Sequence, residues 1–190
     1  MLDLCGWSKL ERADGKVRLP VAGMGLDLGG IGKEYAVDRV FEMVRDTGIE
    51  HILVNFGNDL RMSGQPPEGG PWRVGLEDPA QPGMCWGGVA VTNRAVTTSG
   101  DYHRHLEIDG RRYGHIVDPR TGYPVANGCR AVTVVAPTCT EAGVFSTTAF
   151  ILGPHDGLAF VGAFPQAEAC ILTERQVFKT RRFDEYRIAS

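Results

Sequence analysis

Residues 26–48 read LDLGGIGKEYAVDRVFEMVRDTG and form the first strong pattern in this chain of 190 residues. The glycines of residues 27–33 predict a tight turn that opens a helix. Four apolar side chains then recur at i, i+3, i+4 and i+7, and so form one stripe: Val37, Val40, Phe41 and Val44. Glycine at position 48 stands where such a helix ends. The stretch therefore predicts a helix that packs one face against a core.

The same turn has a chemical interpretation. Glycines let backbone N–H groups approach a ligand closely, and the start of the following helix carries a partial positive charge, so a phosphate group would suit this position. A glycine-rich turn between a strand and a helix is as often only a tight connection. Both interpretations stay open on this motif alone.

Outward from this helix, the pattern predicts further strands and helices. Residues 52–56 indicate a short buried strand that leads into a polar turn, and Asp109-Gly110 indicates a tight hairpin. The remaining strands are predicted at 72–76, 89–91, 95–98, 131–136 and 169–172, and the remaining helices at 140–152 and 157–164. Residues 1–20 are interpreted as a polar lead. Mixed antiparallel strands and packed helices in one domain, residues 1–190, give the fold class α+β.

Composition narrows the range of partners. A formal net charge of -3 without runs of lysine or arginine argues against nucleic acid and favours a small molecule. Five widely spaced cysteines give no disulfide framework and no zinc pattern. The first residues show no signal peptide, and no later stretch predicts a membrane span, so the product as written is expected in the cytoplasm.

Three more polar clusters could carry chemistry. Residues 98–102, Thr-Ser-Gly-Asp-Tyr, gather hydroxyls and a carboxylate, although a polar turn would look the same. Residues 115–124 combine a histidine, an aspartate, an arginine and a threonine, a set that suits phosphoryl chemistry; the alternative is a turn held by two prolines. Thr140, Gly143 and Thr147 share a helix face, which could line a pocket or pack closely against a neighbour.

Taken in order, these clusters resemble the FAD:protein FMN transferases, the ApbE-like flavin transferase family. Its members carry D-L-G-G-I-A-K-G-Y-A-V-D, N-x-G-G-D, S-G-D-Y, H-I-I-D-P-R-T-G and a helix that follows A-P-T. The corresponding positions here are 27–38, 55–59, 99–102, 115–122 and 136–138 onward. Five ordered matches across residues 26–153 are a specific signal, and the resemblance implies an ApbE-like, T-fold-like domain of which this chain holds the later part.

The resemblance implies a magnesium-dependent enzyme that moves FMN from FAD to a threonine or serine of a flavin-acceptor protein, with release of AMP. It implies His115 as the base and the carbonyl of Gly32 and hydroxyl of Thr147 as metal ligands. The residues expected to face the flavin and its phosphates are Gly29, Gly30, Lys33, Asn55, Asp59, Ser99, Asp101, Asp118, Arg120 and Thr121.

Two departures from the family pattern stand out. The family's metal-binding helix reads A-D-A-L-S-T, but this chain has Gly143 in place of the aspartate. Glu141 cannot replace that carboxylate, because two residues along a helix turn a side chain by about 200°. If only this ligand is lost, Gly143→Asp should restore magnesium-dependent turnover. Asn58 also replaces a glycine of the family pattern.

The second departure is length, because family members have a preceding segment and are often periplasmic lipoproteins. The chain is then expected to be a fragment, a half completed by a partner, or a reduced relative, and exposed apolar surface at the missing contacts would favour self-association. Two alternative functions follow from Gly143: a non-catalytic FAD-binding protein and a FAD pyrophosphatase. A domain that binds no flavin is the plainest alternative.

Overall fold

The computed structural model describes residues 2–188, apart from the Arg111 side chain, and centres on one antiparallel sheet. Its strand order is β12-β11-β10-β7-β4-β3. The bounds are β3 Ile52–Phe56, β4 Asp59–Ser63, β7 Arg94–Gly100, β10 Cys129–Ala136, β11 Glu168–Thr173 and β12 Val177–Lys179. The helices are α1 Gly32–Arg45, α2 Cys139–Leu152 and α3 Pro154–Gly162. The predicted α+β class is confirmed.

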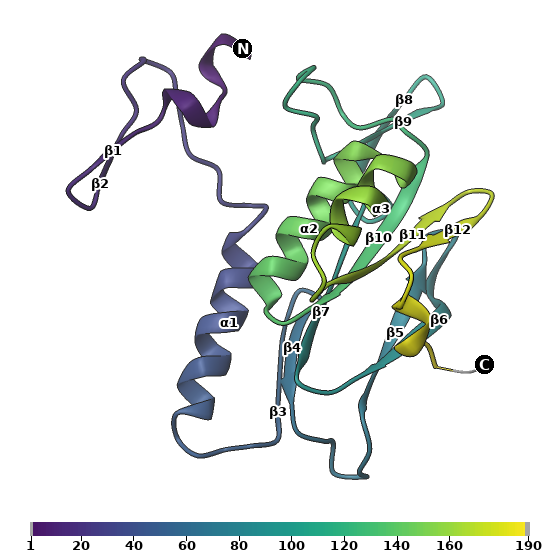
Figure 1. The fold of residues 1–190 in the computed structure, drawn as a ribbon. Coiled ribbons are helices and arrows are strands. Elements are labelled where there is room, and N and C mark those ends of the chain that lie inside the picture. The colour runs from purple at the N-terminus through teal and green to yellow at the C-terminus, as the bar shows by residue number, and fades with distance from the viewer. Residues whose placement is uncertain (1, 189–190) are drawn as a thin grey trace.

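Three two-stranded hairpins complete the described chain: β1 Glu11–Ala13 with β2 Lys16–Arg18, β5 Trp72–Asp78 with β6 Gln81–Val91, and β8 His105–Ile108 with β9 Arg111–Gly114. The β8–β9 turn has positive φ at Asp109 (50°) and Gly110 (72°), as its sequence predicts. Figure 1 shows β1 and β2 beyond the start of α1, away from the main sheet. Residues 1–20 were predicted as a polar lead, but the described part holds this hairpin and two short 3₁₀ helices, Leu2–Leu4 and Trp7–Lys9.

Strand alternation divides the core between the two faces of the sheet. On one face, Val132 and Val134 of β10 pack with α2 residues such as Ala142 and Phe145. On the other face, Val135 packs with apolar residues of the β5–β6 hairpin and with Phe183 of the 3₁₀ helix Phe183–Glu185. Because neighbouring residues of a strand point to opposite faces, β10 contributes to both clusters. In Figure 1, α2 and α3 cover one face, and β5 and β6 lie on the other side.

Two predictions about burial need correction. Residues 52–56 were predicted as a buried strand, but β3 is the last strand of the sheet, and only Ile52 is buried. The apolar stripe of α1 is also only partly right: Val37 and Phe41 are buried, whereas Val40 is 46% exposed. Both differences arise at the edge of the sheet, where β3 is the last strand and α1 packs on β3, β4 and α2 with one side only.

The ends of α2 explain how two helices follow each other without a loop. Gly153 ends α2 with φ 92°, and Pro154 begins α3 directly, so this helix starts earlier than residue 157, where it was predicted. Proline is well suited to a first helical position because its missing N–H has no partner there in any case. None of the helices within the described residues is long and apolar enough to cross a membrane.

Candidate functional site

The glycine-rich turn before α1 is closed largely by its own hydrogen bonds. Gly29 N–H donates to Asp27 Oδ1 (2.7 Å), and Ile31 N–H and Gly32 N–H both donate to the carbonyl of Leu28 (3.1 and 2.7 Å). Gly29 and Gly30 are exposed. These three N–H groups therefore hold the turn together, and a phosphate at this place would have to compete with those bonds or use neighbouring donors.

Lys33 joins this turn to the hairpin between β3 and β4. Its ammonium forms an ion pair with the buried carboxylate of Asp59. Burial raises the pKa of Asp59, and the Lys33 ammonium opposes that shift. In the same hairpin, Asn55 Oδ1 accepts a hydrogen bond from Asn58 N–H (3.0 Å). Asn58 has φ 68°, a conformation in which asparagine is better tolerated than most side chains, so its replacement of a family glycine fits the turn.

A row of hydroxyl groups lies between β7 and α2. Ser99 Oγ lies 2.9 Å from Ser146 Oγ and 3.0 Å from Thr147 Oγ1. Thr97 Oγ1 lies 3.2 Å from Ser146 Oγ, and Ser146 Oγ also donates to the carbonyl of Gly143 (3.1 Å). Ser99 and Thr147, which belong to different predicted motifs, are thus hydrogen-bonded neighbours. This hydroxyl network hydrogen-bonds β7 to α2 beside Gly143.

Gly143 lies against Glu34 of α1. A Cβ atom on Gly143 would lie 2.5 Å from Glu34 Cγ and 3.0 Å from both Cδ and Oε1, whereas packed carbon atoms lie about 3.5–4.0 Å apart. The absent aspartate therefore leaves no empty space, because Glu34 fills it. The expectation that Gly143→Asp would simply restore a ligand overlooked this neighbour, which the new side chain would have to displace.

Glu34 is buried in an unusual way for a carboxylate. The residue is 6% exposed, and its Oε2 atom makes no hydrogen bond to the described part of the chain. Burial raises its pKa above the ordinary range of glutamate. A buried carboxylate is normally paired, because taking it out of water without a partner is costly. Sequence reasoning missed Glu34; the available signal was glutamate at a position where the family motif has glycine.

Asp38 is a second residue that the sequence did not single out. Its carboxylate accepts hydrogen bonds from Cys139 N–H (2.9 Å) and Thr140 N–H (2.8 Å) at the start of α2. It also pairs with Arg61 of β4, whose Nη1 lies 3.0 Å from Oδ1. Since Asp38 follows Glu34 by one turn on α1, and Cys139 precedes Gly143 by about one turn on α2, the two helices meet in antiparallel order. Asp38 thus holds Glu34 opposite Gly143.

Glu141 has a separate role at the start of α2. Thr138 is the N-cap residue and accepts a hydrogen bond from Glu141 N–H (3.2 Å), while its hydroxyl donates to Glu141 Oε2 (2.9 Å). This reciprocal arrangement is typical of a helix N-terminus. Glu141 is therefore turned to the cap, as expected from its distance of two residues from position 143.

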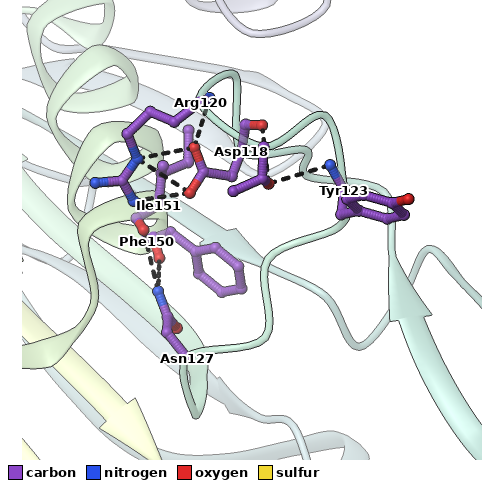
Figure 2. Close-up of polar contacts among 7 residues, drawn as sticks. Asp118, Arg120, Tyr123, Asn127, Phe150 and Ile151 are labelled. Carbon is purple, nitrogen blue, oxygen red and sulfur yellow. Dashed lines mark hydrogen bonds and ion pairs between the residues drawn. The ribbon is translucent and has the colours of Figure 1, made fainter.

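The loop after β9 holds the remaining predicted residues. Figure 2 shows Arg120 forming a fork on the Asp118 carboxylate, with Nε and Nη2 at 2.7–3.1 Å from its oxygens. This pairing lowers the pKa of Asp118. Asn127 donates to the carbonyls of Phe150 (2.8 Å) and Ile151 (3.2 Å), which ties the loop to the end of α2 (Figure 2). The guanidinium predicted for phosphate is thus already paired.

His115 and Asp101 lie where this loop begins. The exposed ring of His115 has Nδ1 3.2 Å from the carbonyl of Arg104. A carbonyl only accepts, so Nδ1 carries the proton and Nε2 of the neutral ring is the basic nitrogen. A Cβ on Gly114 would lie 2.8 Å from Asp101 Cβ, so Asp101 packs on the residue before His115. Arg130 Nη1 lies 3.6 Å from Asp101 Oδ2.

Thr121 has a role within the loop itself. Its hydroxyl accepts a hydrogen bond from Tyr123 N–H (3.2 Å), so it stabilises the turn that follows Arg120. The structure therefore arranges the predicted residues in two groups. One lies along the start of α1 and the middle of α2, where Ser99 and Thr147 meet, and the other forms the loop near the end of α2.

The residues around Gly143 offer oxygen atoms of the type that a metal ion binds. Within residues 2–188, no three histidine, cysteine, aspartate or glutamate side chains are grouped to hold a metal ion. The donors near Gly143 are nevertheless hard oxygens, a buried carboxylate and hydroxyl groups, which is the ligand type that magnesium takes, with few protein carboxylates when a phosphate is also present. A cavity of about 410 Å³ lies among residues 4–10 and 19–27, and none of the candidate site residues lines it.

Comparison with known proteins decides the family. The sequence profile of the ApbE family matches residues 1–171. This chain belongs to the ApbE family. Among curated relatives, an FAD:protein FMN transferase of Escherichia coli K12 is 35% identical over 156 residues, which is 82% of this chain and 44% of the relative. One of Klebsiella pneumoniae is 34% identical over 163 residues, 85% of this chain and 47% of the relative.

Solved ApbE structures share the fold. The ApbE protein of Thermotoga maritima matches with a TM-score of 0.89 and 32% identity, over 99% of this chain and 62% of its own. The flavin transferase ApbE of Vibrio cholerae matches with a TM-score of 0.86 and 28% identity, over 97% and 60%. This ApbE chain thus spans about half the length of the curated relatives and about three fifths of the solved ones.

Proposed function

We propose that this chain carries part of an FAD:protein FMN transferase. The observation that carries the proposal is the agreement between five ordered sequence motifs and the fold: the chain matches the ApbE profile along residues 1–171 and superimposes on solved ApbE structures almost throughout. Relatives named FAD:protein FMN transferase support FAD as the substrate and a protein as the acceptor. A threonine or serine hydroxyl as the acceptor group is what the family resemblance implies.

The proposed reaction is a displacement at the FMN-side phosphorus of FAD. The acceptor hydroxyl oxygen forms the new P–O bond, the bond to the bridging oxygen breaks, and AMP leaves with that oxygen. The hydroxyl proton goes to Nε2 of His115, the nitrogen left basic by the contact of Nδ1 with the Arg104 carbonyl. Magnesium, when bound, would neutralise pyrophosphate charge, and Glu34 and Thr147 offer oxygen donors of the right type.

Other residues of the chain would position the substrate. Lys33, at the start of α1, supplies positive charge beside Asp59, and the helix start adds its partial positive charge. Ser99 and Thr147 form one hydroxyl surface, and Asp101 packs beside the His115 segment. Arg120 would have to exchange its fork with Asp118 for a phosphate oxygen.

The test uses the chain with FAD, magnesium and a panel of peptides, each with a single threonine or serine. Peptide-bound flavin fluorescence together with AMP in equal amount is the expected result. His115→Asn, which keeps a polar side chain and removes the base, should lose transfer by about 10²–10⁴-fold while retaining FAD binding. Transfer unaffected by this variant would exclude His115 as the base, and absence of both products would refute FMN transfer by residues 1–190.

A second candidate function, FAD binding without transfer, is favoured by Gly143 alone. It predicts FAD binding that a chelator does not change, with neither AMP nor peptide-bound flavin produced. AMP together with free FMN, and no modified peptide, would instead identify an FAD pyrophosphatase. The same reaction mixture distinguishes all three outcomes.

A further inference from the structure

The buried carboxylate of Glu34 and the missing side chain at Gly143 are one coupled feature. Glu34 comes from α1 and Gly143 from α2, and the Glu34 side chain fills the volume in which a Cβ at position 143 would lie. In the family motifs the two positions have the opposite residues, glycine on the first helix and aspartate on the second. Neither family residue is present here, but a carboxylate still reaches this face of α2.

Among the described residues, the two basic side chains near Glu34 form their ion pairs with other carboxylates. Lys33 pairs with Asp59, and Arg61 pairs with Asp38 and Glu42. Glu34 Oε2, by contrast, is buried and has no hydrogen-bond partner within the described residues. A buried carboxylate oxygen without a donor is costly unless a cation or a proton is bound to it.

The face of α2 that Glu34 meets at Gly143 also carries a hydroxyl oxygen. Thr147 lies one turn beyond Gly143 on the same face of α2, and its hydroxyl is held by Ser99. The resemblance implies one more oxygen ligand, the carbonyl of Gly32, which is the first residue of α1. Carboxylate, hydroxyl and carbonyl oxygens together suit a hard divalent cation.

We propose that Glu34 replaces the aspartate of the family as the carboxylate ligand of a divalent cation, magnesium or manganese, which Thr147 helps to bind. The position of the ligand has moved from α2 to α1, and Gly143 is the residue that makes room for it. This proposal rests on the proposed function for its choice of metal, but binding of the cation does not require transfer activity.

Metal binding is measured directly, without flavin, by the loss of the electron paramagnetic resonance signal of free Mn²⁺ on titration with the chain. Wild-type protein should bind one Mn²⁺, and Mg²⁺ should compete for it. Glu34→Gln keeps the shape and removes the charge, and should weaken binding by about tenfold or more. Glu141→Gln is the matched control, because Glu141 lies on α2, two residues before Gly143, and its carboxylate is turned to the Thr138 cap; this variant should bind Mn²⁺ as the wild type does.

A reciprocal exchange provides the second measurement. The double variant Glu34→Gly/Gly143→Asp returns both positions to the family arrangement and should recover Mn²⁺ binding lost in Glu34→Gln. Divalent cation should also raise the melting temperature of wild-type protein and of Glu141→Gln, but not of Glu34→Gln, because a ligand that binds the native state stabilises it.

The results that overturn the proposal are specific. Equal Mn²⁺ affinity of wild type and Glu34→Gln would show that Glu34 only fills space. Absence of Mn²⁺ binding by folded wild-type protein would likewise show that Glu34 is not a metal ligand. Mn²⁺ binding that depends on Glu34, in a chain that transfers no FMN, would uphold the metal ligand and refute the proposed function, so the two failures are distinguishable.

Discussion

Replacement of Gly143 by alanine is expected to destabilise the protein only when Glu34 is present. The added Cβ would lie 2.5 Å from Glu34 Cγ, about 1 Å inside the normal contact distance. Relieving such an overlap in a packed region costs about 1–3 kcal/mol. Alanine is favoured over glycine in a helix interior by about 1 kcal/mol. The net loss of unfolding free energy is therefore about 0–2 kcal/mol.

The sign should reverse after Glu34→Ala, which removes Cγ and the carboxylate. Alanine at 143 then meets no Cγ atom, and its helix propensity stabilises the protein by up to about 1 kcal/mol. The two substitutions are therefore expected to couple by about 1–3 kcal/mol, as is typical of residues in contact. Urea unfolding of the four proteins, followed by far-UV circular dichroism, measures this coupling.

A glycine with open space provides the control for this cycle. Gly162, the last residue of α3, has no atom within 4 Å of its Cβ position, so Gly162→Ala should have the same small effect with and without Glu34. If Gly143→Ala also has one effect in both backgrounds, within about 0.3–0.5 kcal/mol, then Glu34 does not occupy that volume and the coupling argument is refuted.

Three further outcomes are expected. Asp38→Ala removes the acceptor for two N–H groups at the start of α2 and leaves Arg61 without this partner, and should lower the urea-unfolding free energy by about 2–4 kcal/mol; a loss below about 0.5 kcal/mol would contradict its capping role. In a thiol-reagent titration, the exposed cysteines should react first and the buried ones only in denaturant, because burial raises the pKa of Cys129 and Cys170 to about 12 and that of Cys139 further; the exposed ones are Cys5 and Cys85. Hydrogen bonds to the Glu77 carboxylate lower its pKa; the one from Gly83 N–H has the larger effect, and the one from His103 follows. The ionised carboxylate therefore stabilises the folded state fully above the ordinary glutamate pKa of about 4.3, and this stabilisation is lost as the pH falls through the lower, folded-state pKa. Wild type and Glu77→Gln should thus differ in unfolding free energy at pH 6 and converge on acidification below about pH 4, and a difference that grows there would exclude this assignment.

Local sequence was sufficient for the elements whose stability is local. The turn before α1 and the Asp109-Gly110 hairpin each depend on residues within a few positions of one another, and their geometry follows from the dihedral and hydrogen-bonding preferences of those residues. The Thr138 cap of α2 is equally local, although the helix was predicted to begin at residue 140. The order of the motifs was likewise enough to indicate the ApbE family, because a motif series is a property of the sequence itself.

Burial and pairing were decided only by the tertiary structure. A short apolar run predicted that 52–56 would be a buried strand, but a strand at the edge of a sheet is covered on fewer sides, and no local pattern records which strand lies there. Likewise, the aspartate absent at position 143 reads in the sequence as a lost ligand, since helix geometry excludes Glu141.

The contact between α1 and α2 changes that conclusion. Asp38 holds the two helices in register, and the fold brings the Glu34 carboxylate from a distant part of the chain onto the face where Gly143 lacks a side chain. A residue's own neighbours in sequence determine its helix face, but only packing between helices determines which carboxylate that face meets.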